Sequence, residues 1–286
     1  KPYYTREDFS DERYSPTFAP KVYSGQNVSV KIYLEQWNGN ETMSVAPYVR
    51  FSGSKKEEVL GYKKLIDKDW YTLEFQIPDS NGDLIDEVDF LLEACSVAKA
   101  KSLGVIYIDD FRIFGKSNYT IDFRKQKVNF GCVSPFSHNY GAWTLQPNGK
   151  LNAMSIGYAE SYSGNYFSSN YEISCNVEPL NGNSHLIAAR VQGTKRGYHV
   201  GFSDKGKVSL FVNDFEIRLI KEVDFDWEFN KTYTFKLIAE DANIKFYIDD
   251  FELLDVDDSS FSYGMYGLVK HSIGRTNYSD IKFIEL

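Results

Sequence analysis

One group of residues that could bind a ligand lies within an alternating segment near the start of the chain. Residues 28–37 alternate between apolar side chains and a second set that includes Tyr33, Glu35 and Trp37. In a β-strand the two sets face opposite sides. An aromatic ring can stack on the C–H face of a pyranose while charged groups bond its hydroxyls. We therefore expect a sugar-binding face outside the core, built from Tyr33, Glu35, Trp37, Tyr48, Arg50 and Glu93. A bare sheet face or a covered domain contact is the alternative.

A second group of candidate residues is cationic, although the chain as a whole is acidic. Guanidinium and ammonium groups form charge-assisted hydrogen bonds with carboxylates and phosphates, and they also bond sugar hydroxyls. We expect a ligand site formed by neighbouring strands or their turn, and by a later loop. Its members are Arg190, Arg196 and His199, then Lys270, His271 and Arg275 on the loop.

A third group is the acidic run 222–228, which contains Glu222, Asp224, Asp226 and Glu228. On one strand these carboxylates would share a face and could act across a glycosidic bond. The run superficially resembles the acid-spaced strand of concanavalin-type glycoside hydrolases, but Asp226 departs from their pattern. Because residues 227–231 lead into the expected strand at 232–237, we expect a solvated turn before a strand, with hydrolysis as the alternative.

The phrase Tyr-Ile-Asp-Asp-Phe occurs twice, at 107–111 and at 247–251. Each copy follows a series of short alternating segments, so each is expected near the last strands of a sandwich. At 249–250 the two aspartates are expected to form a hairpin turn. The repeat therefore predicts two successive β-sandwiches.

The composition excludes several classes of function. The chain has 286 residues and a net charge of −8, without a Lys/Arg run, which disfavours nucleic-acid binding. No apolar stretch approaches the roughly 20 residues that span a bilayer. Three widely spaced cysteines argue against a disulfide framework or a zinc site, and Cys175 is expected in the core. The 16% aromatic content suits pleated, half-buried sheet.

Turn signals between short alternating segments predict an all-β chain of two tandem antiparallel β-sandwich (jelly-roll) domains. No convincing amphipathic helix is present. The junction is expected at residues 116–118, which gives domains 1–116 and 117–286. Strands are expected in the first domain at 28–36, 45–51, 70–78, 88–94 and 105–114, and in the second at 171–177, 185–192, 197–202, 207–213, 232–239, 244–251, 265–269 and 279–284.

Several phrases carry a resemblance to known families. Residues 25–30, 69–78 and 107–111 resemble the galactose-binding-type jelly roll of bacterial carbohydrate-binding modules. The second half resembles concanavalin/laminin-G-type sandwiches, including levan-binding modules, through 143–145, 149–151, 188–192, 196–202, 230–235 and 246–249. The pair is also similar to the C-terminal non-catalytic region of some bacterial ADP-ribosylglycohydrolase-family proteins. These phrases specify the fold well and the ligand poorly.

The resemblance also implies a bound metal ion and a cellular location. Jelly-roll modules of the first type often hold a structural Ca²⁺ between their first and last strands. This implies Asp109 or Asp110 as a calcium ligand, with Glu7, Asp8 or Asp11 as partners. The resemblance favours an extracellular or cell-surface bacterial protein, with the compartment left open.

The sequence therefore favours a non-catalytic pair of carbohydrate-binding modules cut from a larger bacterial protein. A covalently linked neighbouring domain would gain effective concentration at a glycan or polysaccharide. A second hypothesis is that the sandwiches brace an N-terminal enzyme domain or mediate assembly without binding sugar. A third is a glycoside hydrolase, which requires Glu222 or Glu228 with a second carboxylate at roughly 5–9.5 Å.

Overall fold

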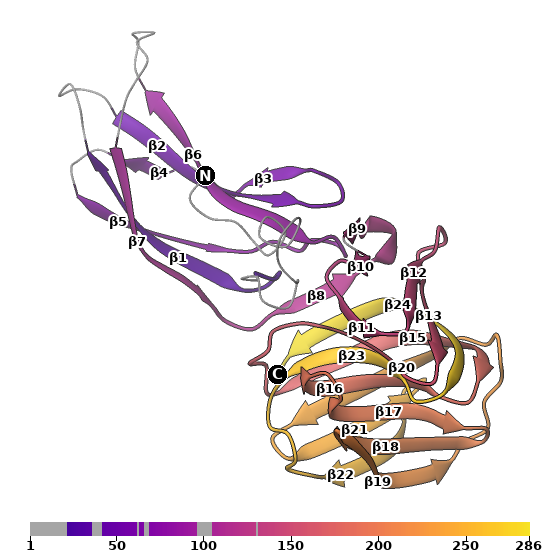
Figure 1. Cartoon of the computed structure of the whole chain (residues 1–286). Coiled ribbons are helices and arrows are strands. Elements are labelled where there is room, and N and C mark those ends of the chain that lie inside the picture. The colour runs from indigo at the N-terminus through magenta and orange to yellow at the C-terminus, as the bar shows by residue number, and fades with distance from the viewer. Residues whose placement is uncertain (1–21, 36–41, 62, 66–68, 96–104, 130) are drawn as a thin grey trace.

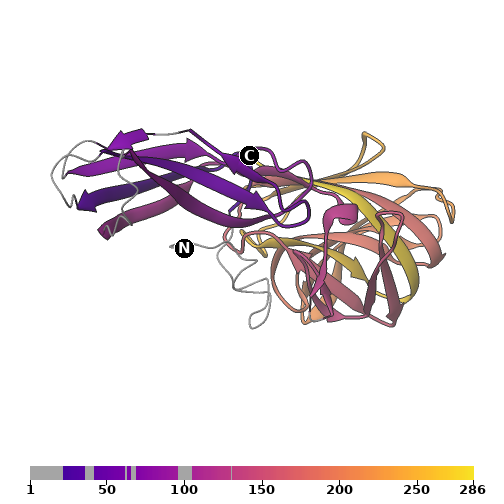
Figure 2. The same cartoon turned by 90° about the horizontal axis from the view of Figure 1, so that it is seen from above.

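The structure is a computed structural model that describes residues 22–35, 42–61, 63–65, 69–95, 105–129 and 131–286. It is an all-β fold of two tandem sandwiches, seen side by side in Figures 1 and 2. Strands β1 to β7 pair among themselves, and so do β8 to β24. No helix in the described ranges has the length and apolar character of a membrane span.

The first sandwich packs a three-stranded sheet, in the order β5-β1-β7, against a four-stranded sheet in which β2 pairs with β3, β4 and β6. All of these pairs are antiparallel. The strands are β1 (Asn27–Glu35), β2 (Thr42–Phe51), β3 (Glu57–Val59), β4 (Lys63–Leu65), β5 (Trp70–Gln76), β6 (Ile85–Cys95) and β7 (Val105–Phe114).

The core of the first sandwich follows from the alternation along β1 and β2. Val30 and Ile32 of β1 are buried against Val45 of β2 and Leu73 of β5. A neighbouring cluster continues this interior with Val28 and its contacts. Because successive side chains of a strand point to opposite faces, the residues between these positions on β1 face outward. The expected inner face of β1 is confirmed.

The second sandwich has a seven-stranded sheet, β11-β14-β23-β16-β17-β18-β19, and an eight-stranded sheet, β12-β13-β24-β15-β20-β21-β22 with β8 beside β24. Its elements are β8 (Asn118–Ile121), the 3₁₀ turn η1 (Phe123–Lys125), β9 (Val128–Asn129), β10 (Cys132–Val133), β11 (Ser137–Tyr140), β12 (Ala142–Leu145), β13 (Leu151–Ile156), β14 (Ala159–Ser163), β15 (Tyr171–Gly182), β16 (His185–Gly193), β17 (Arg196–Asp204), β18 (Lys207–Asp214), β19 (Glu216–Asp224), β20 (Tyr233–Glu240), β21 (Asn243–Ile248), β22 (Phe251–Asp257), β23 (Met265–Lys270) and β24 (Ile273–Glu285).

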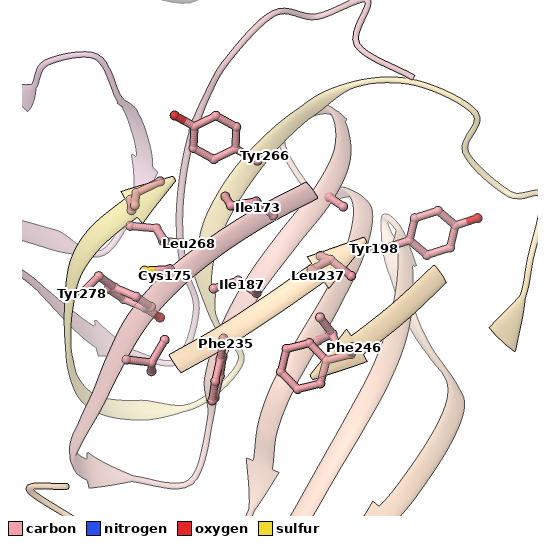
Figure 3. Close-up of a cluster of buried hydrophobic side chains, with 14 of the residues drawn as sticks. Ile173, Cys175, Ile187, Tyr198, Phe235, Leu237, Phe246, Tyr266, Leu268 and Tyr278 are labelled. Carbon is pink, nitrogen blue, oxygen red and sulfur yellow. The ribbon is translucent and has the colours of Figure 1, made fainter. Parts of the chain in front are cut away.

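The two sheets enclose one large aromatic and aliphatic core, part of which is shown in Figure 3. Cys175 lies in it, fully buried, as expected from its place among apolar neighbours, and burial raises the pKa of its thiol. Phe202 packs its ring against Trp227 at 4.8 Å and against Phe235 at 4.9 Å between centroids. This core covers the inner face of the seven-stranded sheet, and the alternate side chains of its strands lie on the outer face.

The two sandwiches meet at the segment that precedes β1, and also where Lys125 and Gln126 donate to the carbonyl oxygens of Asn81 and Gly82. Tyr23 stacks on Tyr119 of β8 with ring centroids 4.3 Å apart, and Tyr119 stacks in turn on Phe283. The backbone N–H of Asn118 donates to the carbonyl of Ser24. A residue from the first half of the chain thus belongs to the core of the second sandwich.

The repeated phrase adopts two different structures. Asp249 and Asp250, with φ of 48° and 68°, form the two-residue turn between β21 and β22, so the expected hairpin is confirmed. Two positive φ values are typical of a type I′ turn. Asp110 has a φ of 53° but lies inside β7, where the pairing with β1 shifts register between Ser29 and Lys31. The first copy is therefore a bulge within a strand.

Candidate functional site

Three aromatic side chains form a row across the outer face of the sheet β5-β1-β7. The register places Tyr33 of β1 opposite Trp70 of β5 and Tyr107 of β7. The Tyr33 ring centroid lies 5.5 Å from that of Trp70 and 5.9 Å from that of Tyr107. Trp70 and Tyr107 each leave 47% of their surface exposed. We call Trp70, Tyr33 and Tyr107 the aromatic row; its sheet is labelled in Figure 1.

Hydrogen-bonding groups lie beside the aromatic row on the same face. The Tyr107 hydroxyl donates to Glu35 Oε2 at 3.1 Å, and this bond raises the pKa of Tyr107. The next cross-strand row consists of Thr72, Lys31 and Asp109. An apolar strip flanked by carboxylate, ammonium and hydroxyl groups can stack a sugar ring and bond its edge.

The four described side chains among the six expected on one sugar-binding face do not share a face. Tyr33 and Glu35 lie on the outer face of β1, whereas Tyr48 and Arg50 belong to β2 in the opposite sheet. The expectation of one common face is wrong because sequence alternation does not specify which sheet a strand joins. Trp37 and the side chain of Glu93 lie outside the described residues.

Tyr48 and Arg50 are instead engaged by a buried carboxylate. The Tyr48 hydroxyl donates to Glu87 Oε1, and Arg50 Nη1 lies 2.7 Å from Glu87 Oε2. Burial, followed by the bond to Glu87, raises the pKa of Tyr48. A buried carboxylate requires such partners, so these contacts compensate the burial of Glu87 and join β2 to β6.

Within the described residues, Asp109 and Asp110 do not belong to an acidic cluster that could hold calcium. Asp110 is ion-paired with Arg112 at 2.5 Å and with Lys31 at 3.1 Å, and bonds from these two cations lower its pKa. A calcium ion at Asp110 would have to displace two positive charges. Among the described residues no group of three acidic, histidine or cysteine side chains could hold a metal. The expected partners of Asp109 and Asp110, namely Glu7, Asp8 and Asp11, lie outside those residues.

Two members of the expected cationic site are buried within the fold. Arg190 is fully buried, and its guanidinium donates to the carbonyl oxygens of Ser169 and Phe261. Lys270 is also fully buried, and burial lowers its pKa to about 7. It ends strand β23 and does not lie in a loop, and its ammonium donates to Ser184 O and to Thr276 Oγ1.

The other members are dispersed. Arg196 pairs with Asp214 at 2.9 Å, and Arg275 lies on β24 in the other sheet, beside Met154. The expectation of a single cationic cluster is therefore wrong, because burial and sheet membership separate these side chains. His199 and His271 do meet: His199 Nδ1 lies 2.7 Å from His271 Nε2. Burial lowers the pKa of His271 to about 4, so this pair is neutral at pH 7.

The acidic run is only partly a turn. Glu222 and Asp224 lie within β19, where Lys207 contacts them at 3.5 and 2.6 Å, and Asp226 and Glu228 follow the strand. Between them Trp227 is buried against Phe202. Lys207 thus offsets one of the two negative charges of these strand carboxylates.

Sequence reasoning missed Trp70 and Tyr107, which complete the aromatic row. A signal was present for both, since Trp70 alternates with the inward side chains of β5, and Tyr107 stands between two isoleucines. The strand register that places both rings beside Tyr33 cannot be predicted from the sequence pattern.

No family model and no curated protein sequence matches this chain. Among solved structures, the carbohydrate-binding module CBM66 from Bacillus subtilis is 22% identical with a TM-score of 0.48, over 52% of this chain and 94% of that one. A beta-glucanase from Bacillus licheniformis is 14% identical with a TM-score of 0.42, over 58% and 97%. Domain 4 of the arabinanase AbnA from Geobacillus stearothermophilus, solved with arabinotriose, is 11% identical with a TM-score of 0.39, over 53% and 82%. Identities this low assign no ligand or activity to this chain, and the expected likeness to ADP-ribosylglycohydrolase-family proteins stays a prediction.

Proposed function

We propose that this chain is a non-catalytic carbohydrate-binding protein that binds a glycan on the aromatic row of its first sandwich. The observation that carries the proposal is the alignment of Trp70, Tyr33 and Tyr107 across three strands, with two rings nearly half exposed. Exposed aromatic side chains in a contiguous row usually mark a binding surface.

The shape of the surface favours an extended ligand. The three rings come from adjacent strands, which lie about 4.8 Å apart in a sheet, so the row runs across the strands for roughly two strand spacings. A polysaccharide segment could stack one ring on Trp70 and bond Glu35 or Lys31 with the next. The charged groups fix orientation and the rings supply contact area.

The acidic residues at 222–228 do not support glycoside hydrolysis as the function. The strand carboxylates Glu222 and Asp224 are both ion-paired with Lys207. A general acid needs a raised pKa, as a carboxyl group in an apolar site has, whereas the side chain of Glu222 is 37% exposed and that of Asp224 is 87% exposed. The proposal is therefore binding without bond cleavage.

A glycan array with the whole chain tests this proposal. Trp70→Ala should weaken binding of any selected glycan by about tenfold or more, equivalent to about 1.4 kcal/mol. Phe251→Ala is the matched control, because it removes an exposed ring, 73% accessible, from the second sandwich. Binding that is unchanged in Trp70→Ala would place the ligand elsewhere, and a row that captures protein but no glycan would favour an assembly role.

A further inference from the structure

Three aromatic side chains of the second sandwich come together where two of its loops meet. Tyr166 and Phe167 belong to the loop between β14 and β15, and Tyr263 belongs to the loop between β22 and β23. The ring centroid of Tyr166 lies 5.2 Å from that of Phe167 and 5.5 Å from that of Tyr263, in T-shaped contacts. The rings of Phe167 and Tyr263 are nearly parallel, with an angle of 25° between their planes. We call these three side chains the loop rings.

Hydrogen bonds and apolar packing anchor the loop rings. The backbone N–H of Gly264 donates to the carbonyl oxygen of Ser168 at 2.9 Å, which joins the two loops. Gln192 Nε2, at the end of β16, donates to the carbonyl oxygen of Tyr263 at 3.1 Å. Tyr166 packs against a buried apolar cluster of the sandwich. Because the rings are already held in place, a ligand would not have to order them.

A charged pair lies beside the loop rings. The guanidinium carbon of Arg196 lies 5.5 Å from the ring centroid of Phe261, which belongs to the same loop as Tyr263. Desolvation raises the pKa of Tyr166, and the nearby charge of Arg196 opposes this shift. Arg196 Nε donates to Asp214 Oδ1 at 2.9 Å. A cation and a carboxylate are thus placed next to an aromatic surface.

The rings are accessible from solvent. Phe167 is 78% exposed and Tyr263 is 36% exposed. Phe215, in the turn between β18 and β19, is 69% exposed, and its ring centroid lies 6.0 Å from the guanidinium carbon of Arg196. Large apolar side chains that gather at one exposed place usually mark a binding surface.

The charged pair also retains hydrogen-bonding capacity toward solvent. The side chain of Arg196 is 37% exposed and that of Asp214 is 60% exposed. Within the described part of the chain, their hydrogen bond uses Arg196 Nε and Asp214 Oδ1, which leaves both Nη groups and Oδ2 for a ligand. A sugar hydroxyl can accept from an N–H and donate to a carboxylate oxygen at the same time. Donors and an acceptor side by side therefore suit a sugar.

We propose that the loop rings and the Arg196–Asp214 pair form a second glycan-binding site, which takes a unit of a neutral sugar chain. The inference rests on the proposed function for the class of ligand, while its residues are separate from the aromatic row. The C–H face of the sugar contacts Phe167 or Tyr263, and its hydroxyls accept from the Arg196 Nη groups and donate to Asp214 Oδ2. Because the charges of Arg196 and Asp214 offset each other, the site favours a neutral sugar.

Nuclear magnetic resonance on the whole chain tests this site separately from the aromatic row. Neutral hexasaccharides of glucose, galactose, mannose, xylose, arabinose and fructose are titrated into the Trp70→Ala protein, which lacks the indole of the row. At least one of them should shift the Arg196 Nε–H and the Phe167 backbone N–H resonances along a saturable curve. Phe167→Ala should weaken that binding by about fivefold or more, because it removes a stacking ring. Phe251→Ala, which removes an equally exposed ring at the other end of β22, is the control and should leave binding within about twofold.

The polar half of the site has its own test in the same Trp70→Ala background. Arg196→Lys keeps the positive charge but replaces the planar fork, so it should weaken binding by about threefold or more. Oligogalacturonate, as a charged sugar chain, should bind more weakly than the selected neutral hexasaccharide. Tighter binding of oligogalacturonate would overturn the assignment to a neutral sugar.

The outcomes separate the two proposals. If no hexasaccharide of the panel moves either resonance, or if Phe167→Ala or Arg196→Lys binds as well as its parent, the second site is wrong whatever the aromatic row does. Self-association that Phe167→Ala abolishes, without any response to sugar, would also overturn it and make the loop rings a contact between copies of the chain. If both resonances respond but Trp70→Ala costs nothing against any glycan, the row fails and the second site stands.

Discussion

The buried cations Arg190 and Lys270 of the second sandwich donate hydrogen bonds to backbone carbonyl oxygens. The Arg190 guanidinium joins Ser169 and Phe261, two loop residues far apart in sequence. Its planar fork presents several donors in fixed directions, which a lysine ammonium cannot reproduce. Arg190 thus positions the loops around β16.

Replacing Arg190 therefore tests a structural role. Arg190→Lys should lower the free energy of unfolding by about 1–3 kcal/mol, because a buried carbonyl loses its donor. Urea denaturation measures this change. Arg196→Lys, at a partly exposed ion pair, should change stability by less than about 0.5 kcal/mol. If Arg190→Lys is as stable as the parent protein but no longer binds glycan, Arg190 has a ligand-binding role and not a structural one.

Neutral histidines make the fold sensitive to acid. Burial lowers the pKa of His138 and His271 to about 4 and that of His185 to about 3. The unfolded chain, with an ordinary histidine pKa near 6.5, binds more protons below that pH. Stability should therefore rise with pH from about 4 to 6.5, by up to about 1.4 kcal/mol per pH unit for each histidine. Urea denaturation across this pH range measures the free energy of unfolding, which should rise less steeply with pH in His271→Gln than in the parent protein. An equally steep rise would contradict the lowered pKa of His271.

At the scale of elements, one pentapeptide takes two conformations. The second copy of Tyr-Ile-Asp-Asp-Phe turns at Asp249-Asp250, and the first continues as a bulged strand held by Lys31 and Arg112. Asp250 needs a left-handed φ, which costs a non-glycine residue energy. Local sequence alone therefore does not decide between turn and bulge, because the first copy pairs along β1 while the second pairs back on its own hairpin.

Glycine substitution tests this difference. Asp250→Gly should raise the free energy of unfolding by a few tenths to about 1 kcal/mol, because glycine adopts positive φ without a steric penalty. Asp110→Gly relieves the same positive φ but removes the ion pairs with Lys31 and Arg112. It should therefore raise the free energy of unfolding by less than Asp250→Gly does. Thermal melting compares the two. A larger gain at Asp110 would mean that its ion pairs do not hold the bulge.

The strands with clean alternation were predictable, and the others were not. β1 and β5 lie close to their expected ranges because one face of each is buried. β19 was missed because it is an edge strand with exposed residues on both faces, so it carries no two-residue signal. The candidate site was half predictable: Tyr33 and Glu35 were found from alternation, but the register that adds Trp70 and Tyr107 depends on tertiary pairing.

At the scale of the molecule, the two sandwiches are not independent. We propose a domain boundary at residues 116 and 117, yet Tyr23 from the first part lies in the second core and stacks on Tyr119. Tyr23→Ala should lower the stability of the second sandwich by about 2–4 kcal/mol, as deletion of a buried ring does. Scanning calorimetry should show its transition shifted down. Tyr33→Ala, in the exposed row, is the control and should leave that transition in place.

The response of the Trp70 indole N–H resonance to added glycan tests most directly the claim that a glycan binds on the aromatic row. The chain is titrated with a glycan selected on the array while the indole N–H resonances of its tryptophans are followed. The Trp70 resonance should move along the binding curve, and that of buried Trp227 should stay fixed. A glycan that saturates the chain while the Trp70 resonance remains unmoved would contradict binding at the aromatic row.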